Sequence, residues 1–208
     1  EGVPCVKPIG RTHYRADMRL PAIRPWCDCG PATDAGRRAG MLWPIPRPSC
    51  RMTDRIHLAD ADATARAGAA MASAAAGGMV IALHGDLGTG KTTLVRGALR
   101  ALGWTGPVKS PTYTLVEYYP FSSLYFYHFD FYRFADPSEW ETAGLADCFR
   151  SDSVCLVEWP ERVAGLLPAA DLDIALTHAP AATGGRDMTL AATTEAGERC
   201  RAAIAATF

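Results

Sequence analysis

A glycine-rich segment between an apolar run and a helical pattern constrains the fold of this 208-residue chain more than any other feature. The segment Gly85-Asp86-Leu87-Gly88-Thr89-Gly90-Lys91-Thr92 satisfies the pattern G-x-x-x-x-G-K-[ST] in full. Residues 79–83 before it are apolar and bounded by glycines, which predicts a strand covered on both faces, and a helical pattern begins at Lys91. We therefore expect an α/β fold built around a strand, a phosphate-binding loop and a helix.

The residues of this loop have the chemistry needed to hold a nucleoside triphosphate and Mg²⁺. Its three glycines permit positive φ angles that turn backbone N–H groups toward a phosphate, and the helix N-terminus adds partial positive charge. We expect Lys91 to reach the β- and γ-phosphates, Thr92 to ligate Mg²⁺ and Thr93 to touch the α-phosphate. The competing interpretation is a glycine-rich turn with an exposed lysine. The residues expected to contact the nucleotide here are Gly85, Asp86, Leu87, Gly88, Thr89, Gly90, Lys91, Thr92 and Thr93.

Two acidic residues each end an apolar strand pattern further along the chain. Asp130 ends the pattern at 125–130 and Glu158 ends the pattern at 154–158. Since ligands of open α/β sheets bind at the carboxyl ends of the strands, one acid is expected to hold Mg²⁺, directly or through water. The other would orient the attacking water or support the first acid, and both assignments stay open. Each acid alone also fits a helix cap or a solvated strand end, and Trp159 is either a packing residue or a stacking partner of the nucleotide.

The polar segment 109–114 separates the loop helix from the next strand pattern. Its hydroxyl groups and its rigid proline suit a loop that senses the γ-phosphate, as switch segments do. Ser110 and Thr112 are the candidate contacts. An ordinary polar turn before a strand is the alternative.

The remaining patterns predict a P-loop NTPase-like, three-layer fold with a mixed, mainly parallel sheet that includes antiparallel hairpins. The patterns 115–119 and 124–132 are too close in sequence for a crossover and are expected to form a hairpin, whereas the connection to 154–157 is long enough for a parallel crossover. A second hairpin is expected around Thr183-Gly184-Gly185. A helix cap at Asp60 or Asp62 supports the first of the helices. The expected strands are 56–58, 79–83, 115–119, 124–132, 154–157, 172–177 and 188–192, and the expected helices end near 76, span 91–102, start at 137 and span 194–206.

The composition divides the chain into an extension, residues 1–51, and one domain, residues 52–208. Residues 1–50 contain eight Pro and no sustained periodicity, so we expect a largely disordered extension or an upstream artefact. The pair in Cys27-Asp28-Cys29 has no second pair at zinc spacing, which disfavours a metal site there. The uncharged stretch 67–83 is rich in Ala and Gly and is interrupted by Gly77-Gly78, which favours helix, turn and strand over a membrane span.

Charge and cysteine usage narrow the class of protein. Residues 1–50 hold eight Lys or Arg against four Asp or Glu, and the remainder holds thirteen against eighteen. An acidic domain does not neutralise nucleic-acid phosphates by itself, so any role with nucleic acid is expected to be indirect. The seven cysteines are an odd number, and Cys155 lies in an apolar strand pattern, which suits reduced thiols and a cytoplasmic location.

Five motifs occur here in the order typical of the TsaE family, formerly YjeE, which this chain therefore resembles: GDLGTGKTT, SPTYTLVEYY, HFDFYR, EWETAGLAD and LVEWPERVAGLLP. The resemblance covers the chain from about Thr53 onward. It implies an ATP-binding and hydrolysing subunit required for N6-threonylcarbamoyladenosine (t6A) modification at position 37 of tRNAs reading ANN codons. TsaB and TsaD are the implied partners, tRNA is contacted only through the complex, and no membrane is involved.

The resemblance also implies roles for individual residues. Lys91 and Thr92 match the family's phosphate and magnesium residues, Asp130 matches its Walker B-like aspartate, and Glu158 with Trp159 matches its EW pair at the nucleotide site. Residues 110–114 match its switch-like loop. The candidate catalytic residues are Lys91, Asp130 and Glu158, the candidate metal ligands are Thr92, Asp130 and Glu158, and Ser110, Thr112 and Trp159 join the nucleotide contacts.

Two alternatives share the phosphate site. A small-molecule kinase also needs an arginine-bearing lid over the transferred phosphoryl group, and Arg133 and Arg162 are the only arginines near the motifs that suggest one. A nucleotide-gated binding module would use ATP to control assembly, with slow or incidental hydrolysis. The dependence of phosphate release on an acceptor or on partners separates these possibilities.

Overall fold

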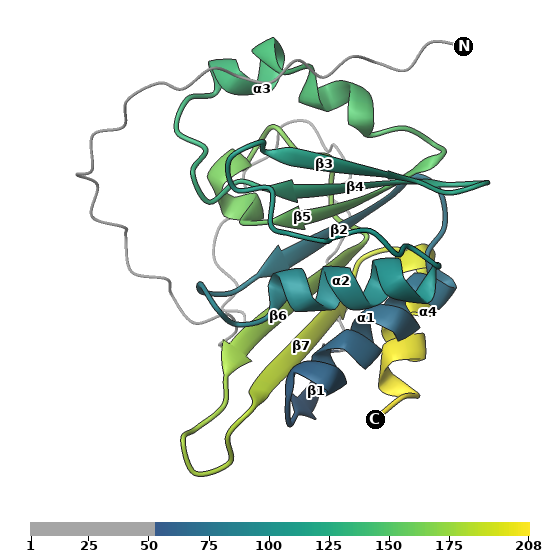
Figure 1. The fold of residues 1–208 in the computed structure, drawn as a ribbon, viewed down its shortest axis with the longest axis vertical. Coiled ribbons are helices and arrows are strands. Elements are labelled where there is room, and N and C mark those ends of the chain that lie inside the picture. The colour runs from purple at the N-terminus through teal and green to yellow at the C-terminus, as the bar shows by residue number, and fades with distance from the viewer. Residues whose placement is uncertain (1–52) are drawn as a thin grey trace, which may run out of the picture. The chain divides into compact units, whose positions relative to one another are not determined.

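The computed structural model describes residues 53–208, which contain one seven-stranded sheet in the order β1-β7-β6-β2-β5-β4-β3 with helices on both faces (Figure 1). The strands are β1 (Thr53–Leu58), β2 (Met79–His84), β3 (Val116–Pro120), β4 (Tyr125–Asp130), β5 (Ser153–Glu158), β6 (Leu172–His178) and β7 (Arg186–Ala192). The helices are α1 (Ala61–Ala74), α2 (Lys91–Ala101), α3 (Ser138–Thr142) and α4 (Glu195–Ala205), with the short 3₁₀ helices η1 (Leu145–Cys148) and η2 (Pro160–Val163).

The centre of the sheet is parallel and its edges are antiparallel. β2 runs parallel to β5 and β6, and β4 runs parallel to β5. β3 pairs antiparallel with β4, β6 with β7, and β7 with β1. The predicted mixed sheet, both hairpins and the parallel crossover into β5 are therefore confirmed. The carboxyl ends of β2, β4 and β5 meet at one edge of the sheet, which is where the phosphate loop begins.

The two faces of the sheet bury different layers. α1, α2 and α4 cover one face, where Ile81 and Leu83 of β2 lie in the larger apolar cluster (Figure 1). α3, η1 and η2 contribute to a second cluster on the other face, where Val80 of the same strand packs. Successive side chains of a strand point to opposite faces, so both faces of the apolar run in β2 are buried. This burial is what the continuous apolar sequence predicted.

Close helix packing fixes α2, the helix that begins at the phosphate loop. A Cβ atom on Gly68 of α1 would lie 2.0 Å from the Leu94 carbonyl oxygen, and one on Gly97 of α2 would lie 2.1 Å from the Ala65 carbonyl oxygen. A side chain at either glycine would force the helices apart. The start of α1 is also anchored, because Asp60 Oδ1 accepts a hydrogen bond of 2.7 Å from the Ala63 backbone N–H.

Among the element boundaries that differ from the sequence-based expectation, three have a clear structural cause. β3 begins at Val116 and not at 115, because Leu115 has a left-handed backbone with φ of 64°. β4 ends at Asp130 and not at 132, because the Asp130 carboxylate turns the chain by accepting the Tyr132 backbone N–H. β1 begins earlier than expected, at Thr53, since antiparallel pairing with β7 extends it beyond its apolar residues.

The remaining expectations concern the N-terminal extension, the uncharged stretch 67–83 and Cys155. The predicted extension 1–51, its boundary with the domain and the Cys27-Asp28-Cys29 segment lie outside the described residues. The uncharged stretch 67–83 forms the end of α1, a turn and most of β2, as predicted. In the part of the chain from 53 onward, none of the helices is long and apolar enough to cross a membrane. Cys155 is buried with a free thiol, as its strand pattern suggested.

Candidate nucleotide site

The loop after β2 has the backbone shape of an anion-binding loop. Gly85, Gly88 and Gly90 have φ angles of 129°, 79° and 105°, a region that favours glycine. A Cβ atom on Gly85 would lie 2.2 Å from the Leu176 carbonyl oxygen of β6, so no side chain fits there. Gly90 is the N-cap of α2 and supplies no side-chain cap, which leaves the first N–H groups of the helix for a ligand.

Lys91 is buried and folds back onto the loop. Its Nζ donates hydrogen bonds of 2.5 Å to the Gly85 carbonyl oxygen and 3.0 Å to the Asp86 carbonyl oxygen. The same nitrogen lies 4.4 Å from the ring centroid of Trp159, a cation–π contact. Burial lowers the pKa of Lys91 in spite of the nearby negative charge of Glu158 and other carboxylates. The loop carbonyls and the indole therefore hold a cation at the centre of the loop.

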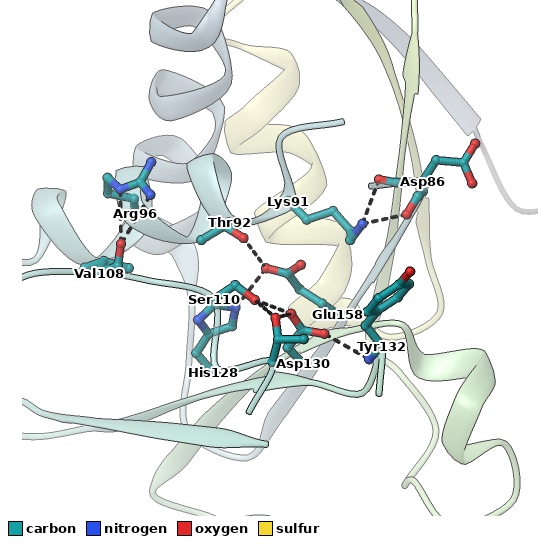
Figure 2. Close-up of polar contacts among 12 residues, drawn as sticks. Asp86, Lys91, Thr92, Arg96, Val108, Ser110, His128, Asp130, Tyr132 and Glu158 are labelled. Carbon is teal, nitrogen blue, oxygen red and sulfur yellow. Dashed lines mark hydrogen bonds and ion pairs between the residues drawn. The ribbon is translucent and has the colours of Figure 1, made fainter. Parts of the chain in front are cut away.

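Glu158, at the end of β5, is joined directly to the phosphate loop. Its Oε1 accepts a hydrogen bond of 2.8 Å from the Thr92 hydroxyl and lies 2.9 Å from Nε2 of His128 (Figure 2). The residue Glu158 is only 3% exposed and His128 is fully buried. β5 lies next to β2 in the sheet, with Glu158 paired to Leu83, and this position brings the carboxylate to the start of α2.

Asp130, at the end of β4, is joined to the switch-like loop instead. Its Oδ2 accepts hydrogen bonds from the Ser110 and Thr112 hydroxyls, the latter at 2.7 Å, and Ser110 and Thr112 also touch each other. Its Oδ1 accepts the Tyr132 backbone N–H at 2.9 Å (Figure 2). Asp130 pairs with Glu158 across the parallel strands, so the two acids are neighbours with different hydrogen-bond partners.

Two strained backbone positions flank these acids. Trp159, directly after Glu158, has φ of 59°, and Leu115, whose carbonyl accepts the Asp130 backbone N–H, has φ of 64°. Positive φ is costly for bulky side chains, about 1–3 kcal/mol at each position, and persists where surrounding contacts impose it. Trp159 is held by its contacts with Lys91 and with the Tyr132 ring, whose centroid is 5.1 Å away. Strain of this kind is concentrated in functional sites.

An ion-pair cluster ties the loop after Glu158 to the strand before the phosphate loop. His84 Nε2 lies 3.0 Å from Asp173 Oδ1, and His84 Nδ1 lies 3.7 Å from Glu161 Oε2. Burial alone would lower the pKa of His84, but these two carboxylates outweigh it and raise the pKa to about 9. In Glu161 the interaction with His84 likewise outweighs burial and lowers the pKa of the carboxyl group. The imidazolium therefore links β2, β6 and η2 at neutral pH.

These residues fit a magnesium-bound nucleoside triphosphate. Uncapped N–H groups, positive-φ glycines and Lys91 suit the phosphates. The Thr92 hydroxyl beside the Glu158 carboxylate offers the oxygen ligands that Mg²⁺ prefers. The donor set has the chemistry that such a ligand needs, and ATP and Mg²⁺ stay predictions from the sequence.

The structure divides the predicted residues into two groups and adds others. One group lies at the phosphate loop and consists of Lys91, Thr92, Glu158 and Trp159. In the other group, Asp130 accepts hydrogen bonds from Ser110 and Thr112. Within the described residues no hydrogen bond joins Thr93 to either acid. Leu87 is exposed at 59%, which leaves it on the outer surface of the loop.

Sequence reasoning missed His128, His84 and Arg186. His128 lies two residues before Asp130 on the same strand face, and this period-2 spacing is the signal that would have found it. His84 directly precedes the loop, but its partners are distant in sequence. Arg186 of β7 donates to Thr64 Oγ1 at 3.0 Å, and a Cβ atom on Gly90 would lie 3.3 Å from its Nε. No local pattern places Arg186 beside the loop.

Residues 58–188 match the family model described as "Threonylcarbamoyl adenosine biosynthesis protein TsaE". Similar proteins carry the name tRNA threonylcarbamoyladenosine biosynthesis protein TsaE. One from Haemophilus influenzae is 55% identical over 94 residues, covering 45% of this chain and 60% of that protein. One from Bacillus subtilis is 43% identical over 102 residues, covering 49% of this chain and 63% of that protein. One from Treponema pallidum is 38% identical over 128 residues, covering 62% of this chain and 93% of that protein.

A solved structure has the same fold. The crystal structure of Bacillus subtilis YdiB superposes with a TM-score of 0.62 at 28% sequence identity, covering 76% of this chain and 98% of that chain. The aligned segments span less than two thirds of the Haemophilus influenzae and Bacillus subtilis relatives in sequence, at 60% and 63% of their lengths.

Proposed function

Because this chain belongs to the TsaE family of threonylcarbamoyl adenosine biosynthesis proteins, we propose that it binds and hydrolyses ATP to support t6A formation at position 37 of tRNAs reading ANN codons. It acts in the cytoplasm with TsaB and TsaD and reaches tRNA only through them. The observation that carries the ATPase proposal is the Thr92–Glu158 hydrogen bond of 2.8 Å beside the phosphate loop. This bond joins the expected metal-binding hydroxyl to the carboxylate that a hydrolytic site requires.

The loop residues bind the triphosphate. Lys91 exchanges the carbonyl oxygens of Gly85 and Asp86 for phosphate oxygens, while the backbone N–H groups at the start of α2 face the same anion. Trp159 covers the Lys91 ammonium and limits access of water to it. Binding is thus assigned to residues that are preorganised by the fold.

The carboxylates act on the hydrolytic step. Thr92 would hold Mg²⁺ directly and Glu158 would hold it through a bound water, and the ion supplies neutralisation of the charge on the phosphate oxygens when bound. In the reaction a water oxygen bonds to the γ-phosphorus, the bond to the ADP oxygen breaks, and Glu158 orients that water and accepts its proton. Asp130 acts indirectly, by holding Ser110 and Thr112 of the switch-like loop in place.

Phosphate release from ATP by the purified chain, alone and with TsaB and TsaD, tests the proposal. We expect slow release alone, clear stimulation by the partners, and loss of release with EDTA or with Glu158→Gln. Glu117→Gln, an exposed acid on β3, is the matched control and should behave like the wild type. Equal rates with and without partners contradict the assembly role, no release in any mixture contradicts the ATPase, and acceptor-dependent release indicates a kinase.

A further inference from the structure

His128 is an unusual residue for the middle of a core strand. It is fully buried on β4, where its neighbours in sequence, Tyr127 and Phe129, pack in an apolar cluster on the opposite face. Its Nε2 lies 2.9 Å from Glu158 Oε1, whereas its Nδ1 is buried and has no hydrogen-bond partner among the described residues. Buried polar atoms normally have hydrogen-bond partners. Because Nδ1 of His128 has none among the described residues, the contact between its Nε2 and Glu158 needs a functional explanation.

The surroundings assign the imidazole proton to Nε2. With the proton on Nδ1, an N–H group would be buried without an acceptor, and the Nε2 lone pair would face the Glu158 carboxylate oxygen at 2.9 Å. With the proton on Nε2, the short contact becomes a charge-assisted hydrogen bond and only a lone pair is left unpaired. His128 is therefore a hydrogen-bond donor to Glu158.

The two donors on Glu158 converge on the same oxygen. Oε1 accepts a hydrogen bond from the Thr92 hydroxyl, whose oxygen is 2.8 Å away, and lies 2.9 Å from Nε2 of His128, the second donor. Oε2 receives no hydrogen bond from the part of the chain that the structure describes, as Figure 2 shows for the residues drawn. One carboxylate oxygen is thus fixed by the protein and the other is left for a ligand. The Thr92 hydroxyl also keeps its lone pairs, because its proton is directed toward Glu158.

We propose that His128 is a positioning residue for Glu158, donating from Nε2 to Oε1 so that Oε2 stays oriented toward the water and hydrated cation of the phosphate site. The inference rests on the proposed ATPase function. It extends that function by one residue that acts through Glu158 and touches no substrate atom. A carboxylate held by Thr92 alone would rotate about its terminal torsion, which is broad in glutamate.

Two substitutions separate hydrogen bonding from packing. His128→Phe keeps a ring of similar size and removes the donor, whereas His128→Gln places an amide N–H near the position of Nε2. We expect His128→Phe to lower kcat for ATP hydrolysis about 10–100-fold with little change in KM, and His128→Gln to restore most of it. His178→Phe, which changes an exposed histidine at the end of β6, is the matched control and should leave kcat unchanged. A glutamine variant as impaired as the phenylalanine variant would overturn the proposal.

A double-mutant cycle asks whether His128 acts through Glu158. On the Glu158→Gln background, His128→Phe should reduce the residual rate no further, because the carboxylate that it positions is already gone. A purely structural role predicts an additional loss of similar size on both backgrounds. That additive result would contradict positioning even if both variants fold normally.

Two readouts do not depend on turnover. Long-range ¹H–¹⁵N spectra of the ligand-free protein, labelled in histidine, should show His128 protonated at Nε2, and protonation at Nδ1 alone would overturn the inference. The Mg²⁺ concentration that half-maximally stabilises the protein with ATP against heat should rise about 10-fold or more in His128→Phe and return toward the wild-type value in His128→Gln. If the wild type hydrolyses no ATP, the proposed function fails while the tautomer result still stands or falls by itself.

Discussion

The carboxyl ends of β4 and β5 look equivalent in the sequence but contact different parts of the site. Each is a mainly apolar strand that ends in an acid, and the two acids, Asp130 and Glu158, are paired neighbours in the sheet. Glu158 is bonded to Thr92 of the phosphate loop, whereas Asp130 is bonded to Ser110 and Thr112 of the switch-like loop. The difference follows from strand order, because β5 lies beside β2 and β4 is one strand farther away.

A strand-end carboxylate therefore takes its role from its neighbours in the sheet and not from its sequence pattern. Glu158, next to the phosphate loop, accepts a hydrogen bond from the Thr92 hydroxyl, which is the expected Mg²⁺ ligand. Asp130, one strand farther along the sheet, holds the switch-like loop. We therefore expect changes at Glu158 to act on chemistry and changes at Asp130 to act first on loop order. The following variants test that division.

The largest effect is expected for Glu158→Gln. The amide keeps the shape of the side chain but loses the charge that orients water and accepts a proton, so ATP hydrolysis should fall about 10²–10⁴-fold. ATP affinity should change only slightly, because Lys91 and the loop N–H groups are intact. Single-turnover phosphate release and ATP titration measure the two quantities. A variant that hydrolyses ATP at the wild-type rate would remove Glu158 from the mechanism.

Asp130→Asn should have a smaller effect on hydrolysis and a larger effect on the switch-like loop. The Asp130 carboxylate accepts hydrogen bonds from Ser110, Thr112 and the Tyr132 backbone N–H. The amide NH₂ group of asparagine would point a donor at one or two of these donors, so those hydrogen bonds would be weakened. We expect hydrolysis to fall about 10–100-fold. Hydrogen exchange of the Leu115 amide should accelerate in this variant and stay unchanged in Glu158→Gln. Equal protection of the Leu115 amide from hydrogen exchange in both variants would contradict the proposed division of roles between Glu158 and Asp130.

Removing single hydroxyls from the loop should give graded, smaller losses. Ser110→Ala and Thr112→Ala each remove one donor to Asp130, so each should lower the free energy of unfolding by about 0.5–1.5 kcal/mol. Both should slow hydrolysis less than Asp130→Asn does. Thr112→Ser keeps the hydroxyl and is the control for the second variant. Urea unfolding provides the measurement, and a Thr112→Ser variant as unstable as Thr112→Ala would point to the lost methyl group instead.

The smallest effect is a pH dependence on the Glu158 side. The pKa of His84 is raised to about 9 by Asp173 and Glu161, against an ordinary value of 6.5, so its pairing stabilises the fold fully below pH 6.5 and is lost as pH rises through 9. We expect the unfolding free energies of wild type and His84→Phe to differ by up to about 1 kcal/mol at pH 6 and to converge above pH 9. A difference that grows with pH would show that the ion pairs are not the cause. His178→Phe should follow the wild-type pH profile.

Much of the fold was predictable because it is encoded locally. The glycine spacing of the phosphate loop, the apolar run of β2 and the short link between β3 and β4 each specify an element or a pairing from adjacent residues. The motifs shared with the family then indicated which residues belong to the candidate site. What could not be predicted depends on strand order, which no local pattern determines.

The unpredicted parts of the site are contacts between segments far apart in the chain. The assignment of Glu158 to Thr92 required the knowledge that β5 and not β4 lies beside β2. His84 meets Asp173 across 89 positions, and Arg186 reaches Thr64 across 122. His128 was missed for another reason, because its period-2 spacing from Asp130 indicates a shared strand face but not its partner, Glu158. The boundary errors at Leu115 and Asp130 arose where the site itself bends the backbone.

A crystal structure of the chain with Mg²⁺ and a non-hydrolysable ATP analogue tests the division between the two acids most directly. The account predicts Mg²⁺ about 2.0–2.1 Å from the Thr92 hydroxyl oxygen, with Glu158 as the nearest carboxylate, bound directly or through one water. His128 Nε2 and Glu158 Oε1 should remain hydrogen-bonded, and Asp130 should stay with the switch-like loop. An ion bound directly by Asp130, with Glu158 turned away from Thr92, would contradict the account.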